Sequence, residues 1–223
     1  MKLILFDVDG TLIDSQHVIV RAMTMAYAAH DRPAPPRETI LSVVGLSLPQ
    51  AFAVLSGADP EFPATSFADA YKQAFFQLNS DPGQGAPLFP GAREVIEALS
   101  QRSDVVLGLA TGKSRRGVDR MLDLHRLEGV FATVQTADDH PSKPAPDMVF
   151  AAMAETGASA AATVLLGDTT FDMEMTRAAG AVPIGAGWGY HPADELSAAG
   201  AHIVLDEFAG FLPAIERLGE ATT

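Results

Sequence analysis

The stretch LILFDVDGTLIDS, residues 3–15, joins an apolar run of four residues to a pair of carboxylates. Asp7 follows the run directly, and Asp9 lies two residues further along. Short runs that are apolar throughout are typical of strands in a parallel sheet, because both faces of such a sheet are covered. Side chains two residues apart on an extended chain share a face, so both carboxylates are expected to point to one place. The stretch therefore predicts a buried strand that ends at two acids.

Further apolar runs recur along the chain and alternate with stretches long enough for helices. The runs are VVLGLA (105–110), FATVQ (131–135), TVLLG (163–167), AVPIGA (181–186) and HIVL (202–205). The helical-length stretches include residues 92–102, 146–157 and 171–180. This alternation predicts an α/β fold with a doubly wound, mostly parallel sheet, that is, a Rossmann-like core. Such sheets bind ligands beyond the carboxyl ends of their strands, where Asp7, Thr111 and Asp168 stand.

One long segment after the first strand breaks this alternation. It reads as four successive helical stretches, at residues 15–30, 37–45, 49–57 and 66–80, punctuated by proline- and glycine-rich pieces at 31–36 and 81–87. We interpret residues 15–81 as an α-helical cap domain inserted into an α/β catalytic core made of residues 1–14 and 82–223. Linkers near residues 12–16 and 81–88 would be its hinges.

The composition limits the classes of partner and compartment. The 223 residues are 48% hydrophobic and 19% charged, which is typical of a globular protein, and the formal net charge is -13. That charge argues against nucleic acid or an anionic membrane as a partner, since both attract clustered lysine and arginine. The chain has no cysteine, no apolar stretch of the roughly 20 residues that a membrane span needs, and no signal-peptide pattern. We expect a soluble, cytoplasmic protein.

A second pair of acids, Asp168 and Asp172, stands in GDTTFD (167–172) at the end of another predicted strand. Together with Asp7 and Asp9 this pair would place four carboxylates around one point, where they repel one another unless a cation lies between them. Ligation by oxygen alone favours Mg²⁺ over zinc. The alternative interpretation is that Asp9 belongs to a tight turn and Asp172 is an acid favoured at a helix N-terminus.

Two further segments carry candidates for phosphate binding. The tripeptide Thr111-Gly112-Lys113 follows an apolar run and opens a predicted helix, where a hydroxyl and free backbone N–H groups form a natural anion site. A capping role for Thr111 is the alternative. Lys143 lies in PSKPAPD (141–147), where the proline after it holds it in an extended conformation on a short loop.

Four features of the chain match the order and approximate spacing of the four motifs of the haloacid-dehalogenase-like phosphohydrolases. They are DVDGT (7–11), Thr111, Lys143 and GDTTFD (167–172). The helical insertion after the first strand resembles the cap of the subgroup that contains phosphoglycolate phosphatases and β-phosphoglucomutases. The segments at 88–99 and 179–190 also resemble phosphoglycolate-phosphatase-like members, so the resemblance covers essentially the whole chain.

The resemblance implies a role for each acid. Asp7 would be the nucleophile that attacks phosphorus and forms an aspartyl-phosphate. Asp9 would protonate the leaving alcohol and then activate the water that releases phosphate. Mg²⁺ would be held by Asp7, the backbone carbonyl of Asp9 and Asp168, with Asp172 as a supporting or outer ligand.

The resemblance also implies that Thr111, the Gly112 N–H and Lys143 hold the phosphoryl oxygens. Lys143 would in addition restrain the charge of Asp7. Gly112 stands where many relatives carry asparagine, so a side-chain amide is missing while the backbone donor is kept.

The implied function is a Mg²⁺-dependent phosphatase for a small phosphorylated metabolite, with 2-phosphoglycolate as the favoured substrate and a monomer or homodimer as the working form. A β-phosphoglucomutase-like sugar phosphomutase and a pyrophosphatase are alternatives on the same scaffold. A phosphoryl-accepting signalling domain is an alternative of another class, against which Asp9 and the large cap argue. The cap is expected to close over the site, exclude bulk water and bring specificity residues to the substrate.

Overall fold

The computed structural model describes residues 1–57, 59–78 and 85–220. The strands are β1 (Lys2–Phe6), β2 (Val105–Thr111), β3 (Thr133–Thr136), β4 (Thr163–Gly167), β5 (Val182–Ala186) and β6 (Ile203–Leu205). The helices are α1 (Gln16–Ala28), α2 (Arg37–Leu41), α3 (Leu48–Leu55), α4 (Ala64–Leu78), α5 (Ala92–Ser100), α6 (Arg115–His125), α7 (Asp147–Thr156), α8 (Thr170–Ala178), α9 (Ala193–Ala198) and α10 (Phe211–Glu220). Two short 3₁₀ helices, η2 (Ala160–Ala162) and η3 (Phe208–Gly210), complete the assignment.

The six strands form one parallel sheet in the order β3-β2-β1-β4-β5-β6. Ile4 at the middle of β1 pairs with Leu107 on one side and with Val164 on the other. The chain builds outward from β1 to β3 and then crosses back to β4, so the direction of winding reverses between β1 and β4. This reversal is the topological switch point at which doubly wound sheets bind ligands. The predicted fold class is confirmed.

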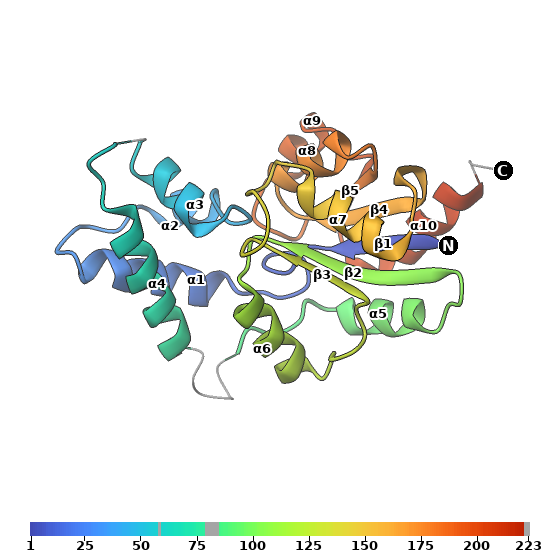
Figure 1. The fold of residues 1–223 in the computed structure, drawn as a ribbon, viewed down its shortest axis with the longest axis horizontal. Coiled ribbons are helices and arrows are strands. Elements are labelled where there is room, and N and C mark those ends of the chain that lie inside the picture. The colour runs from blue at the N-terminus through green and yellow to red at the C-terminus, as the bar shows by residue number, and fades with distance from the viewer. Residues whose placement is uncertain (58, 79–84, 221–223) are drawn as a thin grey trace.

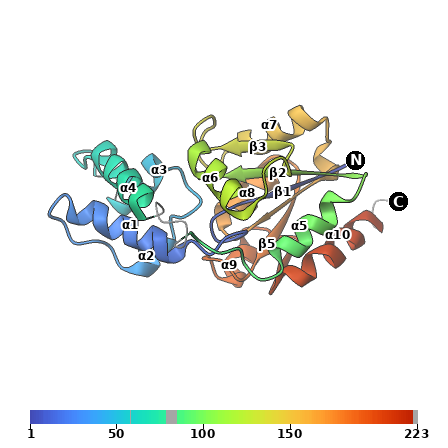
Figure 2. The same cartoon turned by 90° about the horizontal axis from the view of Figure 1, so that it is seen from below.

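The four apolar residues of β1 alternate between the two faces of the sheet. Ile4 and Phe6 pack into a core cluster with α5, α6 and α10, and Figure 2 shows α5 and α10 together along this face. Leu3 and Leu5 pack into a second cluster with α7 and α8. All four are fully buried. The apolar run therefore reflects two covered faces, and it fixes the position of the acid that follows it.

Some boundaries differ from the expected ones. The helix expected over 37–45 ends at Leu41, and the turn that follows it passes through Gly45 at φ +99°, a left-handed conformation that glycine adopts readily. The helix expected to open at Thr111 begins at Arg115. The strand expected over 131–135 is displaced to Thr133–Thr136. Helices α9 and α10 were not among the expected helices.

Helices α1 to α4 lie together at one end of the molecule, apart from the sheet (Figure 1). They share a core of their own, in which the buried side chains of Tyr27, Phe52 and Phe67 have ring centroids 4.9–6.4 Å apart. The division at residues 81 and 82, and the first half of the second predicted linker, lie outside the described residues. Among the described residues, no helix combines the length and the hydropathy that a bilayer crossing requires.

Candidate active site

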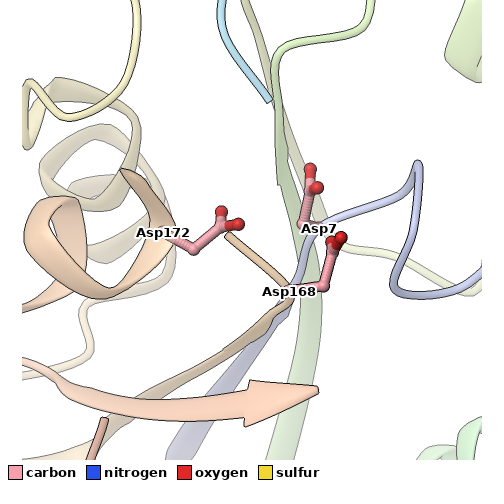
Figure 3. Close-up of side chains that lie close together, drawn as sticks. All are labelled: Asp7, Asp168 and Asp172. Carbon is pink, nitrogen blue, oxygen red and sulfur yellow. The ribbon is translucent and has the colours of Figure 1, made fainter. Parts of the chain in front are cut away.

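Three carboxylates converge at the switch point of the sheet. Asp7 follows β1, Asp168 follows β4, and Asp172 stands in the first turn of α8 (Figure 3). One oxygen from each of the three lies within 4.8 Å of the others, and all three side chains are buried. The sequence analysis expected these acids to meet at the carboxyl ends of the strands, and the parallel pairing of β1 with β4 places Asp7 and Asp168 side by side.

Asp168 is held in place by the loops around it. Its Oδ1 accepts a hydrogen bond from the Thr11 hydroxyl at 2.8 Å, and its Oδ2 accepts one from the Tyr190 backbone N–H at 3.0 Å. Gly10 adopts φ +88°, and a Cβ at this position would overlap the Asp168 carboxylate. The glycine of DVDGT is therefore required twice, for its backbone conformation and for the close approach.

Asp172 is both a member of the acidic cluster and an acid at a helix N-terminus, the two interpretations that the sequence allows. It forms a capping box with Thr169, whose backbone N–H and hydroxyl donate to Asp172 Oδ2 at 3.1 and 2.7 Å. Its Oδ1 accepts a hydrogen bond from Lys143 Nζ at 2.6 Å. The acid that starts α8 thus also neutralises the lysine of the site.

Lys143 is the cation of this cluster and is 1% exposed. Its Nζ lies 2.9 Å from Asp7 Oδ1 as well as bonding Asp172. Asp7 Oδ2 is buried and receives no hydrogen bond from the described residues. Pro146, at the end of this loop, is the N-cap of α7.

The electrostatics of the cluster favour an additional cation. Burial raises the pKa of Asp7 to about 6, against the opposing effect of Lys143, and Asp172 raises it further. Burial raises the pKa of Asp168 well above its usual range, and the charges of Asp7 and Asp172 add to that effect. Burial alone would lower the pKa of Lys143, but its two carboxylate partners outweigh burial and raise it. Three carboxylates face one ammonium, so two negative charges remain for a divalent metal ion, with Asp7 Oδ2 as an available ligand.

The side chain of Asp9 lies outside this cluster. Lys113 Nζ donates to both of its oxygens, at 2.8 and 2.9 Å. The same Nζ lies 4.7 Å from the centroid of the Phe75 ring on α4. Sequence analysis assigned no role to Lys113, although its place directly after Thr111 and Gly112 was a signal that it could reach the same site.

Thr111 and Gly112 lie at the end of β2. The Thr111 hydroxyl is buried and accepts a hydrogen bond from the Lys113 N–H at 3.2 Å. The helix that follows is capped by Ser114, whose side chain accepts from the Gly117 N–H, so the capping alternative for Thr111 is wrong. Its hydroxyl hydrogen is left to donate to a ligand.

The need for a glycine at position 112 is explained by the segment around Gly45, which the sequence analysis did not connect to it. A Cβ at Gly112 would overlap the Gly45 carbonyl oxygen and lie 2.9 Å from the Leu46 carbonyl oxygen. The adjoining Ser47 N–H donates to the Ser142 hydroxyl at 2.8 Å, one residue before Lys143. The loop before α3 therefore rests on both candidate phosphate-binding segments, and the missing side chain makes room for it.

Comparison with known proteins gives one consistent result. A family model described as "Haloacid dehalogenase-like hydrolase" matches residues 4–186. The curated "Probable phosphatase IndB" of Dickeya dadantii (strain 3937) is 35% identical over 218 residues, which cover 97% of this chain and 94% of that protein. A "Phosphoglycolate phosphatase" of Pseudomonas syringae pv. syringae (strain B728a) is 28% identical over 95% of this chain and 79% of its own. The solved structure of a hydrolase from Pseudomonas syringae superimposes with a TM-score of 0.85 at 26% identity, over 97% of this chain and 99% of that one.

The Gly112→Ala substitution tests the contact between the two loops. We expect it to lower the free energy of unfolding by about 1–3 kcal/mol, because the added methyl group forces the Gly45 carbonyl away. Gly210→Ala is the matched control, since a Cβ there meets nothing closer than 3.4 Å and the unfolded chain loses the same freedom. Urea denaturation measures both. Equal effects of the two substitutions would show that the loop does not press on Gly112.

The Lys143→Met substitution tests the electrostatic role of the buried lysine. In a chelator at pH 7 we expect a loss of about 3–5 kcal/mol in the free energy of unfolding, because two buried carboxylates lose their cation. The control is Lys72→Met on α4, where the side chain is 62% exposed and lies 3.8 Å from Asp69. That control should change stability by less than about 1 kcal/mol. A loss at Lys143 as small as the control's would contradict the argument.

Proposed function

We propose that this chain, which belongs to the haloacid dehalogenase-like hydrolase family, is a Mg²⁺-dependent phosphatase that acts on a small phosphate monoester through an aspartyl-phosphate. The observation that carries the proposal is the state of Asp7 at the switch point. It is buried, and Oδ2 has no hydrogen-bond donor among the described residues, while Lys143 lies 2.9 Å from Oδ1. Such a carboxylate is positioned to meet an electrophile and a metal, and packing alone does not explain it.

Asp7 and Asp168 are the proposed side-chain ligands of Mg²⁺, joined by the backbone carbonyl of Asp9. Asp172 is a supporting ligand, since its Oδ1 already pairs with the Lys143 ammonium and its Oδ2 accepts a hydrogen bond from Thr169. The donor set is all oxygen and buried, which suits a hard divalent cation. When bound, Mg²⁺ supplies the positive charge that lets an anionic nucleophile and an anionic ester occupy one pocket.

The phosphoryl group would be bound by the Thr111 hydroxyl, the Gly112 N–H and the Lys143 ammonium. These groups come from the end of β2 and from the loop before α7, on the side of the sheet that Asp7 faces. Fixed donors of this kind stabilise charge on the phosphoryl oxygens without having to reorganise during the reaction.

The reaction would proceed in two displacements at phosphorus. A carboxylate oxygen of Asp7 attacks phosphorus, the bond to the ester oxygen breaks, and the leaving alkoxide takes a proton from Asp9. A water molecule then gives a proton to Asp9 and attacks the phosphorus of the aspartyl-phosphate, which releases inorganic phosphate and restores both acids. Lys113 would hold Asp9 between these steps, given its two short hydrogen bonds to that carboxylate.

The proposed domain division assigns residues 15–81 to a helical cap and residues 1–14 and 82–223 to the catalytic core. The separate apolar core of α1 to α4 supports this division. Hinges near 12–16 and 81–88 would let the cap admit substrate and then shield the aspartyl-phosphate from bulk water.

The names of the relatives favour 2-phosphoglycolate as the substrate to test first, and a small phosphorylated metabolite as the class. A sugar phosphomutase and a pyrophosphatase remain competing activities on the same scaffold, and a signalling domain that only accepts the phosphoryl group remains a competing class. The second acid and the enclosing helices support turnover over simple phosphoryl storage.

Release of inorganic phosphate from a panel of esters tests the proposal. The panel contains 2-phosphoglycolate, sugar phosphates, nucleotides and pyrophosphate, with Mg²⁺ or with chelator. We expect Mg²⁺-dependent release that Asp7→Asn lowers on the order of 10⁴-fold, whereas Asp194→Asn on the exposed surface of α9 leaves it unchanged. Silence on every ester together with a trapped phosphoryl group on Asp7 would favour the mutase or signalling alternatives. The proposal would be refuted if no ester released phosphate and no phosphoryl group were trapped on Asp7.

The effect of Mg²⁺ on stability should depend on pH. The folded-state pKa of Asp7 is raised to about 6, so in metal-free protein its stabilising contribution is full below about pH 4 and is lost as pH rises through 6. Mg²⁺ binds the ionised carboxylates, so its stabilising effect should appear over the same range. We expect the rise in Tm caused by Mg²⁺ to be larger at pH 7 than at pH 5, and smaller in Asp7→Asn. An equal rise at both pH values would contradict this assignment of the metal ligands.

A further inference from the structure

One wall of the cleft between the helical end and the sheet is aromatic. Tyr71 and Phe75 stand one turn apart on α4, and their rings stack with centroids 5.8 Å apart. Both line a cavity of about 920 Å³ that also contains Asp7 and Asp9. The wall therefore belongs to the same cavity as the proposed nucleophile.

The aromatic pair lies beside the proposed general acid. Lys113 Nζ bonds both oxygens of Asp9 and sits 4.7 Å from the Phe75 ring centroid. Burial raises the pKa of Tyr71, and the nearby charge of Asp9 raises it further. Because Asp9 would protonate the leaving oxygen, the organic part of the ester must lie next to Asp9. It would then face Tyr71 and Phe75.

The rest of the lining is also mainly apolar on the cap side. It includes Val18 and Ile19 from α1, Val43, Val44 and Leu46 from the chain between α2 and α3, and Leu48 at the start of α3. A cavity of this size is in the range of pockets that enclose drug-sized ligands. An ester that carries a ring would contact more of this apolar surface than a two-carbon ester.

The lysines and arginines that line the cavity are Lys72, Lys113, Arg116 and Arg120. Lys113 is already bonded to Asp9, and Lys72 is 62% exposed and lies close to Asp69. Arg116 is placed over the Phe76 ring at 4.2 Å. At Lys113, the carboxylate of 2-phosphoglycolate would have to compete with Asp9.

We infer that the preferred substrate is a phosphate monoester whose organic group carries a flat apolar ring, which packs against Tyr71 and Phe75. The inference rests on the proposed phosphatase activity and refines its substrate class. The residues that select the substrate would then lie on α4, on the face that is turned toward Asp9 and Lys113.

The experiment compares kcat/KM for benzyl phosphate, ethyl phosphate and 2-phosphoglycolate at saturating Mg²⁺. All three release primary alcohols, so differences in leaving-group chemistry are small and contacts with the organic group dominate. We expect benzyl phosphate to exceed both other esters by at least about tenfold, in line with the usual strength of stacking on an aromatic side chain.

The variant Phe75→Ala then locates the preference. We expect it to lower kcat/KM for benzyl phosphate about tenfold and for ethyl phosphate less than twofold, since ethyl phosphate has no ring to pack. Phe150→Ala on α7 is the control, because its side chain is 49% exposed and does not line the cavity. The control should leave all three values unchanged.

Each other outcome is decisive. Hydrolysis with 2-phosphoglycolate or ethyl phosphate preferred over benzyl phosphate in the wild-type protein would overturn the inference and leave the phosphatase proposal standing. An equal fall for benzyl and ethyl phosphate in Phe75→Ala would show that Phe75 acts through Lys113 and Asp9, which also overturns it. No hydrolysis of any of these three esters would overturn the inference, whereas the phosphatase proposal itself is decided by the wider panel and the phosphoryl-trapping test described above.

Discussion

The structure depends on how three buried carboxylates are kept within 4.8 Å of one another. Lys143 contacts two of them, and hydrogen bonds from Thr11 and from the Tyr190 backbone hold the third. These contacts still leave two negative charges in excess. A folded protein that keeps such an arrangement has accepted an electrostatic cost, and a bound cation offsets that cost. The proposed catalysis and the proposed metal binding would therefore depend on the same buried charges.

The sheet topology creates this requirement. Because the direction of winding reverses between β1 and β4, these two parallel central strands deliver acids to the same edge of the sheet. The loops must then pass very close to the carboxylates. Gly10 permits this close approach because it has no Cβ, although a glycine loses more conformational entropy on folding than other residues do. Asp172 is held in the cluster by two interactions, because it forms the capping box of α8 and also pairs with Lys143.

The helical end of the molecule is connected to the chemistry at two points. One is the loop through Gly45, which rests directly on Gly112 and bonds Ser142 next to Lys143. The other is the face of α4, where Phe75 lies against the lysine that holds Asp9. The first connection involves the groups proposed to bind the phosphoryl oxygens, and the second involves the proposed general acid. A movement of the cap would thus act on both ends of the bond to be broken.

The sequence by itself determined the fold class and the order of the candidate catalytic and phosphate-binding segments along the chain. Apolar runs that end in acids identify buried parallel strands and their active edge, because the burial of both faces and the strand period leave a local pattern. Only the tertiary structure decided which side chains meet. That Lys113 binds Asp9, that Asp172 pairs with Lys143, and that Gly112 lies under the Gly45 carbonyl are contacts between segments 29 to 104 residues apart. Such contacts depend on three-dimensional packing, which leaves no periodic trace in one sequence.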